Sequence, residues 1–128
     1  MPFHLPTRLI RAHGIAALAT LAGALLFGIV ASIELLLPDF AGNHAWLSWG
    51  RLRYDHTQGI LFGWLGNAFL ACLYHCVPIL TRRPVTSDRL GQWLFALWNF
   101  AVVVPGWALV LAGFSQPLEW AEIGRAHV

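Results

Sequence analysis

Residues 57–80, TQGILFGWLGNAFLACLYHCVPIL, decide the fold, because they contain no aspartate, glutamate, lysine or arginine. A membrane-spanning α-helix needs about 20 predominantly apolar residues, and this stretch is long enough. Residues 12–33 and 90–111 are two further stretches without such charges. The sequence therefore predicts an all-α transmembrane protein with three membrane-spanning helices, at about residues 12–37, 56–80 and 90–114.

The overall composition agrees with a membrane location. The 128 residues are 58% hydrophobic and 11% charged, whereas soluble domains are about 25% charged. The three stretches could also be buried helices in the core of a water-soluble protein, but this interpretation is less consistent with the low charge content. A cleaved signal peptide is also less consistent with the first stretch, since signal cores are only about 7–15 residues long. The small net charge of +2 is scattered along the chain and gives no indication of nucleic-acid binding.

The arginines predict the orientation of the chain in the membrane. Two precede the first span, two lie between the first and second spans, and three lie between the second and third: Arg8 and Arg11, then Arg51 and Arg53, then Arg82, Arg83 and Arg89. Cytoplasmic segments carry the excess of arginine and lysine. We therefore expect the N-terminus and residues 82–89 on the cytoplasmic side, and the connection at residues 38–55 on the outer side.

One histidine lies where the second span begins, in the stretch RLRYDHTQ at residues 51–58. On a helix, His56 shares one face with Gly59, Gly63 and Asn67 because these residues are three and four positions apart. Two glycines spaced in this way can admit a neighbouring helix. They can also admit a flat cofactor such as haem, with the histidine as axial ligand and arginines pairing with the haem propionates. A third interpretation is that His56 lies at the membrane–water interface and binds no ligand.

Two asparagines lie within the predicted spans. Asn67 falls in the second span and Asn99 in the third. Polar side chains in spans hydrogen-bond across helices. We therefore expect these two residues to form hydrogen bonds between spans.

Three stretches resemble one family of membrane proteins. Residues 50–75, GRLRYDHTQGILFGWLGNAFLACLYH, are similar to the second transmembrane region of the catalytic subunit of cbb3-type cytochrome c oxidases, of the haem–copper oxidase superfamily. That family reads roughly G-R-L-R-P-L-H-T-N at this point. Residues 35–40, LLLPDF, resemble its first connection, and residues 93–122 resemble its third helix. The resemblance covers about residues 12–121.

The resemblance implies a role for three residues. His56 would be one axial ligand of a low-spin haem b, and Arg53, with Arg51 more weakly, would lie near the haem propionates. The haem would receive electrons from cytochrome c-type subunits of the complex and pass them to a high-spin haem and copper, where oxygen is reduced to water. The implied partners are membrane lipid and the remaining helices of the same subunit. The implied location is the bacterial inner membrane.

The sequence departs from the family pattern beside the histidine. Tyr54 and Asp55 occupy the positions where the family has proline and leucine, and Gln58 occupies the position where it has asparagine. Asp55 could tune the environment of the ligand or face water. The large subunit of nitric oxide reductase, which shares the superfamily fold, is an alternative. A stand-alone three-helix membrane protein that acts as an interaction or accessory partner is another.

The resemblance also implies an incomplete enzyme. The second haem ligand and the copper ligands of the family lie on later helices, so we expect the fragment to be inactive, its full-length parent being the oxidoreductase. The last residues, EIGRAHV, equal the translation of a common sequencing adapter. We therefore expect residues 1–121 to be the N-terminal part of the oxidase subunit and residues 122–128 to be an artefact.

Overall fold

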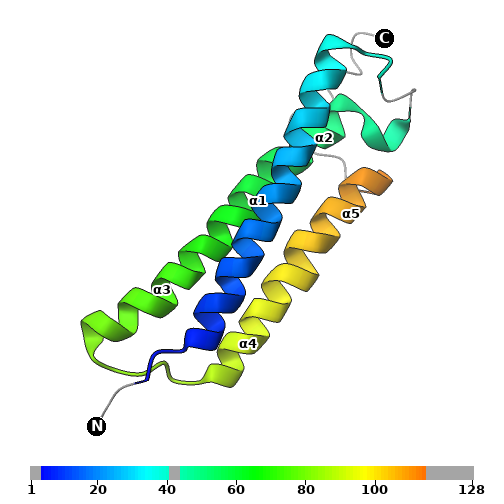
Figure 1. The fold of residues 1–128 in the computed structure, drawn as a ribbon. Coiled ribbons are helices and arrows are strands. Elements are labelled where there is room, and N and C mark those ends of the chain that lie inside the picture. Colours follow the sequence, from blue (N-terminus) through cyan, green and yellow to red (C-terminus); the bar gives the residue numbers. More distant parts are fainter. Residues whose placement is uncertain (1–3, 41–43, 115–128) are drawn as a thin grey trace.

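The computed structural model describes residues 4–40 and 44–114, which form three long helical rods packed side by side (Figure 1). The first rod is the single helix α1. The second and third rods each consist of two α-helices joined by a π-helical segment, and each rod is long and apolar enough to span a membrane. The bounds are α1 Thr7–Leu36, then α2 Trp49–Gln58, η2 Gly59–Leu65 and α3 Gly66–Thr81, then α4 Asp88–Leu97, η3 Trp98–Val103 and α5 Val104–Ala112.

The predicted all-α arrangement of three spans is confirmed, and the helices begin earlier than expected. The rods start at Thr7, Trp49 and Asp88, rather than at about residues 12, 56 and 90. Only the short 3₁₀ turn η1, Ala45–Leu47, precedes α2 in the described part of the first connection. As a result, His56 lies within a helix instead of at its start. The expectation for residues 122–128 falls outside the described residues.

Local chemistry explains where several helices begin and end. The Ser87 side chain caps α4 by accepting a hydrogen bond from the backbone N–H of Leu90 at 3.3 Å, as is typical of a helix N-terminus. Arg82 ends α3 in the left-handed conformation, with φ of 53°. Gly113 ends α5 in the same way, with φ of 81°, where glycine carries no steric penalty.

Small residues allow the three rods to approach closely. A Cβ atom on Gly59 would lie 2.9 Å from the Cβ of Ala24 and 2.5 Å from the Trp107 ring, and one on Gly63 would lie 2.7 Å from the Cβ of Thr20. The glycine face therefore packs against α1 and the third rod, as in a small-xxx-small contact. The interpretation that a flat cofactor lies against these two glycines is wrong, because protein side chains occupy that space.

A buried polar network joins all three rods in the half of the bundle away from His56. Asn67 Nδ2 donates to Asn99 Oδ1 at 2.8 Å, and Asn99 Nδ2 donates back to Asn67 Oδ1 at 3.1 Å. The predicted hydrogen bonding between spans is thus confirmed. His13 of α1, which sequence analysis did not single out, extends the network through a 2.8 Å contact between its Nδ1 and Asn67 Oδ1.

Candidate functional site

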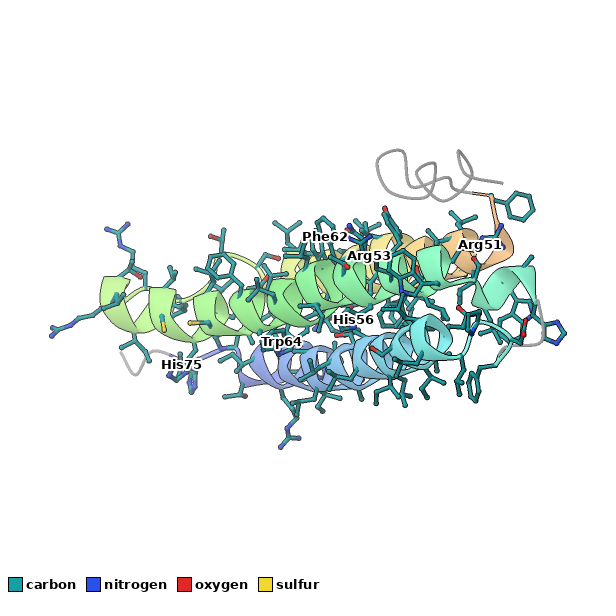
Figure 2. The ribbon with its side chains drawn as sticks, turned by 90° about the horizontal axis from the view of Figure 1, so that it is seen from above. Arg51, Arg53, His56, Phe62, Trp64 and His75 are labelled. Atoms are coloured by element: carbon teal, nitrogen blue, oxygen red, sulfur yellow. The ribbon has the colours of Figure 1, made fainter. Side chains whose placement is uncertain are left out.

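His56 lies two turns into the second rod, opposite the middle of α1, and is half-buried between α2 and α1 (Figure 2). Its Nδ1 is 2.7 Å from the backbone carbonyl oxygen of Ala24. A carbonyl oxygen can only accept a hydrogen bond, so Nδ1 must carry the proton. In the neutral imidazole, Nε2 then carries the lone pair. This tautomer is the one that can bind a metal through Nε2.

A glycine in α1 makes room for the His56 ring. A Cβ atom on Gly28 would lie 2.6 Å from Nδ1 and 2.7 Å from Cε1 of His56. Ordinary contacts of a Cβ atom begin at 3.4 Å, so no other residue type fits here without moving the imidazole. No pattern along the sequence pointed to Gly28 or Ala24, because both lie in a different span from the histidine that they contact.

Arg53 and Arg51 lie on the same helix as His56 (Figure 2). Arg53 is exposed, and its guanidinium carbon is 5.1 Å from the centroid of the Trp49 ring. Arg53 is also three residues before His56, and residues spaced in this way are neighbours on a helix surface. Its positive charge therefore lies near the histidine on the surface of the helix.

Arg51 is placed differently. Its Nη1 donates to the carbonyl oxygens of Ala45 at 2.6 Å and Leu111 at 3.4 Å. Leu111 is in the last turn of α5, where cations stabilise the unpaired carbonyls of a helix C-terminus. Arg51 therefore connects the second rod to the end of the third.

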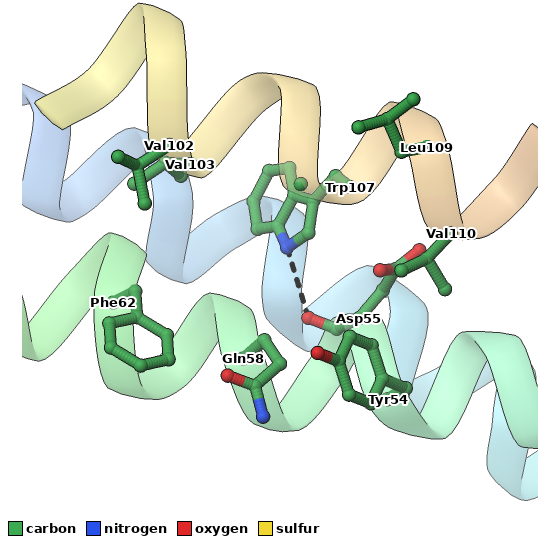
Figure 3. A pocket seen from close by; sticks show the side chains of 10 residues that line it. Tyr54, Asp55, Gln58, Phe62, Val102, Val103, Trp107, Leu109 and Val110 are labelled. Carbon is green, nitrogen blue, oxygen red and sulfur yellow. Dashed lines mark hydrogen bonds between the residues drawn. The ribbon is translucent and has the colours of Figure 1, made fainter. Parts of the chain in front are cut away.

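Asp55 is buried beside the histidine, contrary to the alternative that it faces water. Neither of its carboxylate oxygens has a hydrogen-bond partner among the described residues. The residue lines a cavity of about 220 Å³ with Tyr54, Gln58 and Trp107 among others (Figure 3). The Trp107 indole N–H donates to the backbone carbonyl of Asp55 at 3.1 Å. Asp55 thus points toward the third rod, whereas His56 points toward α1.

The described residues do not enclose a metal ion by themselves. In residues 4–40 and 44–114, no group of three or more histidine, cysteine, aspartate or glutamate side chains could hold one. A haem-binding histidine does not require such a cluster, because the macrocycle supplies most of the ligands of the iron. The carbonyl bond to the second ring nitrogen of His56 is the arrangement usual for metal-binding histidines.

The fold and the site place this chain among helical membrane proteins with several spans. Residues 8–127 match the family described as Cytochrome C and Quinol oxidase polypeptide I, and the chain belongs to this family. It is 32% identical over 98 residues to a cytochrome c oxidase subunit 1 homolog of Azorhizobium caulinodans, covering 76% of this chain and 17% of the relative.

Other relatives agree with this assignment. A cbb3-type cytochrome c oxidase subunit CcoN1 of Stutzerimonas stutzeri is 28% identical over 96 residues, covering 75% of this chain and 20% of the relative. A bacteroid subunit 1 homolog of Bradyrhizobium diazoefficiens is 32% identical over 97 residues, covering 76% of this chain and 18% of the relative. The chain therefore spans a fifth or less of the length of these relatives. No solved structure matches the chain.

Proposed function

We propose that this chain is the N-terminal part of the catalytic subunit of a cbb3-type terminal oxidase, which transfers electrons from cytochrome c-type subunits to oxygen. Family membership supports the proposal, and so does the similarity to the cbb3-type cytochrome c oxidase subunit of Stutzerimonas stutzeri. The full-length parent is then an oxidoreductase, and the segment of residues 1–121 contributes to its electron-transfer site without being active alone.

His56 is the proposed axial ligand of a low-spin haem b. The observation that carries this assignment is the 2.7 Å hydrogen bond from His56 Nδ1 to the Ala24 carbonyl, because it leaves the Nε2 lone pair for iron and fixes the plane of the ring. When bound, the haem supplies a reversible one-electron change at iron. The protein supplies the ligand, its tautomer and its orientation.

Arg53 is the proposed partner of the haem propionates. Its exposed guanidinium can pair bidentately with a carboxylate. Arg51, whose Nη1 donates to two backbone carbonyls, is the weaker candidate on the family resemblance. The second axial ligand, the high-spin haem and copper belong to the remaining helices of the subunit, which are the proposed partners together with lipid and the cytochrome c-type subunits. The proposed location is the bacterial inner membrane, with the N-terminus in the cytoplasm.

The test compares two histidine variants of the full-length subunit encoded at the genomic locus. His56→Ala removes the proposed ligand, and His75→Ala, on the same rod near its other end, is the matched control (Figure 2). Haem content and the reduced-minus-oxidised spectrum are measured on both purified variants. We expect His56→Ala to lose the low-spin haem b band and His75→Ala to retain it.

Two outcomes contradict the proposal. If the low-spin band survives His56→Ala at full intensity, His56 is not the ligand. If the purified wild type consumes nitric oxide but not oxygen, the parent is a reductase of nitric oxide and not a terminal oxidase.

A further inference from the structure

A second cavity lies at the opposite end of the bundle from His56, where α3 ends and the chain turns toward α4. Its volume is about 360 Å³, and it lies between the last turns of α3 and residues 83–86 of the connection. Arg82 makes this possible, because its left-handed backbone, with φ of 53°, ends the helix there. The connection then returns along the end of α3.

One wall of this cavity is an apolar stripe. Leu70, Leu73 and Val77 line it from α3, at spacings that place them on one face of the helix. Leu73 and Val77 are 38% and 47% exposed. Seven residues of helix extend about 10 Å along the axis. The wall is therefore a strip parallel to the span, of the shape that an extended hydrocarbon chain covers.

The other end of the cavity is polar and cationic. Thr81, Arg83 and Thr86 line it there. The Thr81 hydroxyl donates to the Val77 carbonyl at 2.8 Å, so the donors that face a ligand are the Thr86 hydroxyl and the Arg83 guanidinium. Guanidinium groups bind phosphate oxygens bidentately, and the Thr86 hydroxyl can donate to a remaining oxygen. This end of the cavity therefore has the donors that a phosphate group requires.

The charge of the whole bundle end complements an anion. Five arginines and one aspartate lie in or beside the helix ends that meet there: Arg8, Arg11, Arg82, Arg83, Arg89 and Asp88 (Figure 1). Basic pockets between spans attract anionic lipid head groups. The polar end of the cavity is also where the second span stops, which is the level of the lipid phosphates in a bilayer.

We propose that this cavity binds one anionic phospholipid, with its phosphate against Arg83 and Thr86 and one acyl chain along the apolar stripe. Phospholipid is the occupant that uses both ends of the cavity, because inorganic phosphate would leave the stripe uncovered and a purely apolar helix would leave the arginine without an anion. The proposal does not depend on the haem ligand, because His56 does not line this cavity.

The test uses the 128-residue chain in mild detergent, with phosphatidylglycerol or phosphatidylcholine of the same acyl chains as probes. Native mass spectrometry measures the bound fraction of each lipid. We expect phosphatidylglycerol to bind more tightly than phosphatidylcholine. Arg83→Gln should weaken phosphatidylglycerol binding by about fivefold, the contribution of one arginine near the membrane surface. Arg82→Gln is the matched control, since it removes the same charge one residue away from the cavity lining.

A third variant tests the apolar wall. Leu73→Trp fills the stripe and should reduce the binding of both lipids while leaving the helical circular dichroism of the chain unchanged. Equal weakening by Arg82→Gln and Arg83→Gln would overturn the proposal, because overall charge would then account for binding. It would also be overturned if wild type bound the two lipids equally. A disulfide formed in the full-length subunit between Leu73→Cys and a cysteine introduced on another helix would overturn it too, since protein would then occupy the cavity.

Discussion

The substitution Gly28→Ala tests whether α1 holds the proposed haem ligand. The added Cβ would lie 2.6 Å from Nδ1 of His56, which is about 0.8 Å closer than the start of ordinary contact at 3.4 Å. Both partners are confined, because Gly28 is within α1 and His56 is within α2. The imidazole must therefore move away, and its 2.7 Å bond to the Ala24 carbonyl must lengthen or break.

The size of the effect follows from two opposing terms. Overpacking a well-filled interface costs about 1–3 kcal/mol. Replacing glycine by alanine in a helix stabilises it by about 0.5–1 kcal/mol. Gly14→Ala in the same helix is the matched control, since a Cβ atom there would have no neighbour within 4 Å. Helix propensity cancels between the two variants, so Gly28→Ala should be less stable than Gly14→Ala by about 1–3 kcal/mol.

The assay is unfolding of the chain in mixed micelles by sodium dodecyl sulfate, followed by circular dichroism. A double variant identifies the cause: in Gly28→Ala/His56→Ala the ring is gone, so the alanine at position 28 should no longer destabilise. In the full-length subunit, Gly28→Ala should also weaken haem retention by about 10–100-fold, as loss of such an orienting hydrogen bond does at metal sites. Equal stability of Gly28→Ala and Gly14→Ala would refute the reasoning.

The remaining predictions concern contacts between rods, measured by the same unfolding assay. Asn67→Leu should destabilise the chain more than Asn99→Leu, because Asn67 hydrogen-bonds to both Asn99 and His13. Each hydrogen bond between spans contributes about 0.6 kcal/mol and at most about 1.7 kcal/mol, and the reverse order would contradict the network. Arg51→Gln should destabilise by about 0.3–1 kcal/mol through the end of α5, whereas a loss of propionate binding with unchanged stability would show that Arg51 acts on the haem instead.

The number and approximate positions of the helices could be predicted, because the hydropathy of the sequence is enough to locate membrane-spanning segments. The three uncharged stretches correspond to the three rods of the structure, since only a helix satisfies its own backbone hydrogen bonds in lipid. The hydrogen bonding of Asn67 and Asn99 was predictable for a related reason: a polar side chain in a span has few other partners. The π-helical segments Gly59–Leu65 and Trp98–Val103 were not predicted, because no composition signal distinguishes them from α-helix.

The sequence by itself determined that this chain crosses a membrane three times and carries His56 near one end of its second span. Only the tertiary structure decided which ring nitrogen of His56 carries the proton, which glycine makes room for it, and that Asp55 turns inward. The physical reason is that each of these facts depends on contacts between rods. Such contacts join residues of different spans, and no pattern along one span reveals which residue of another lies opposite.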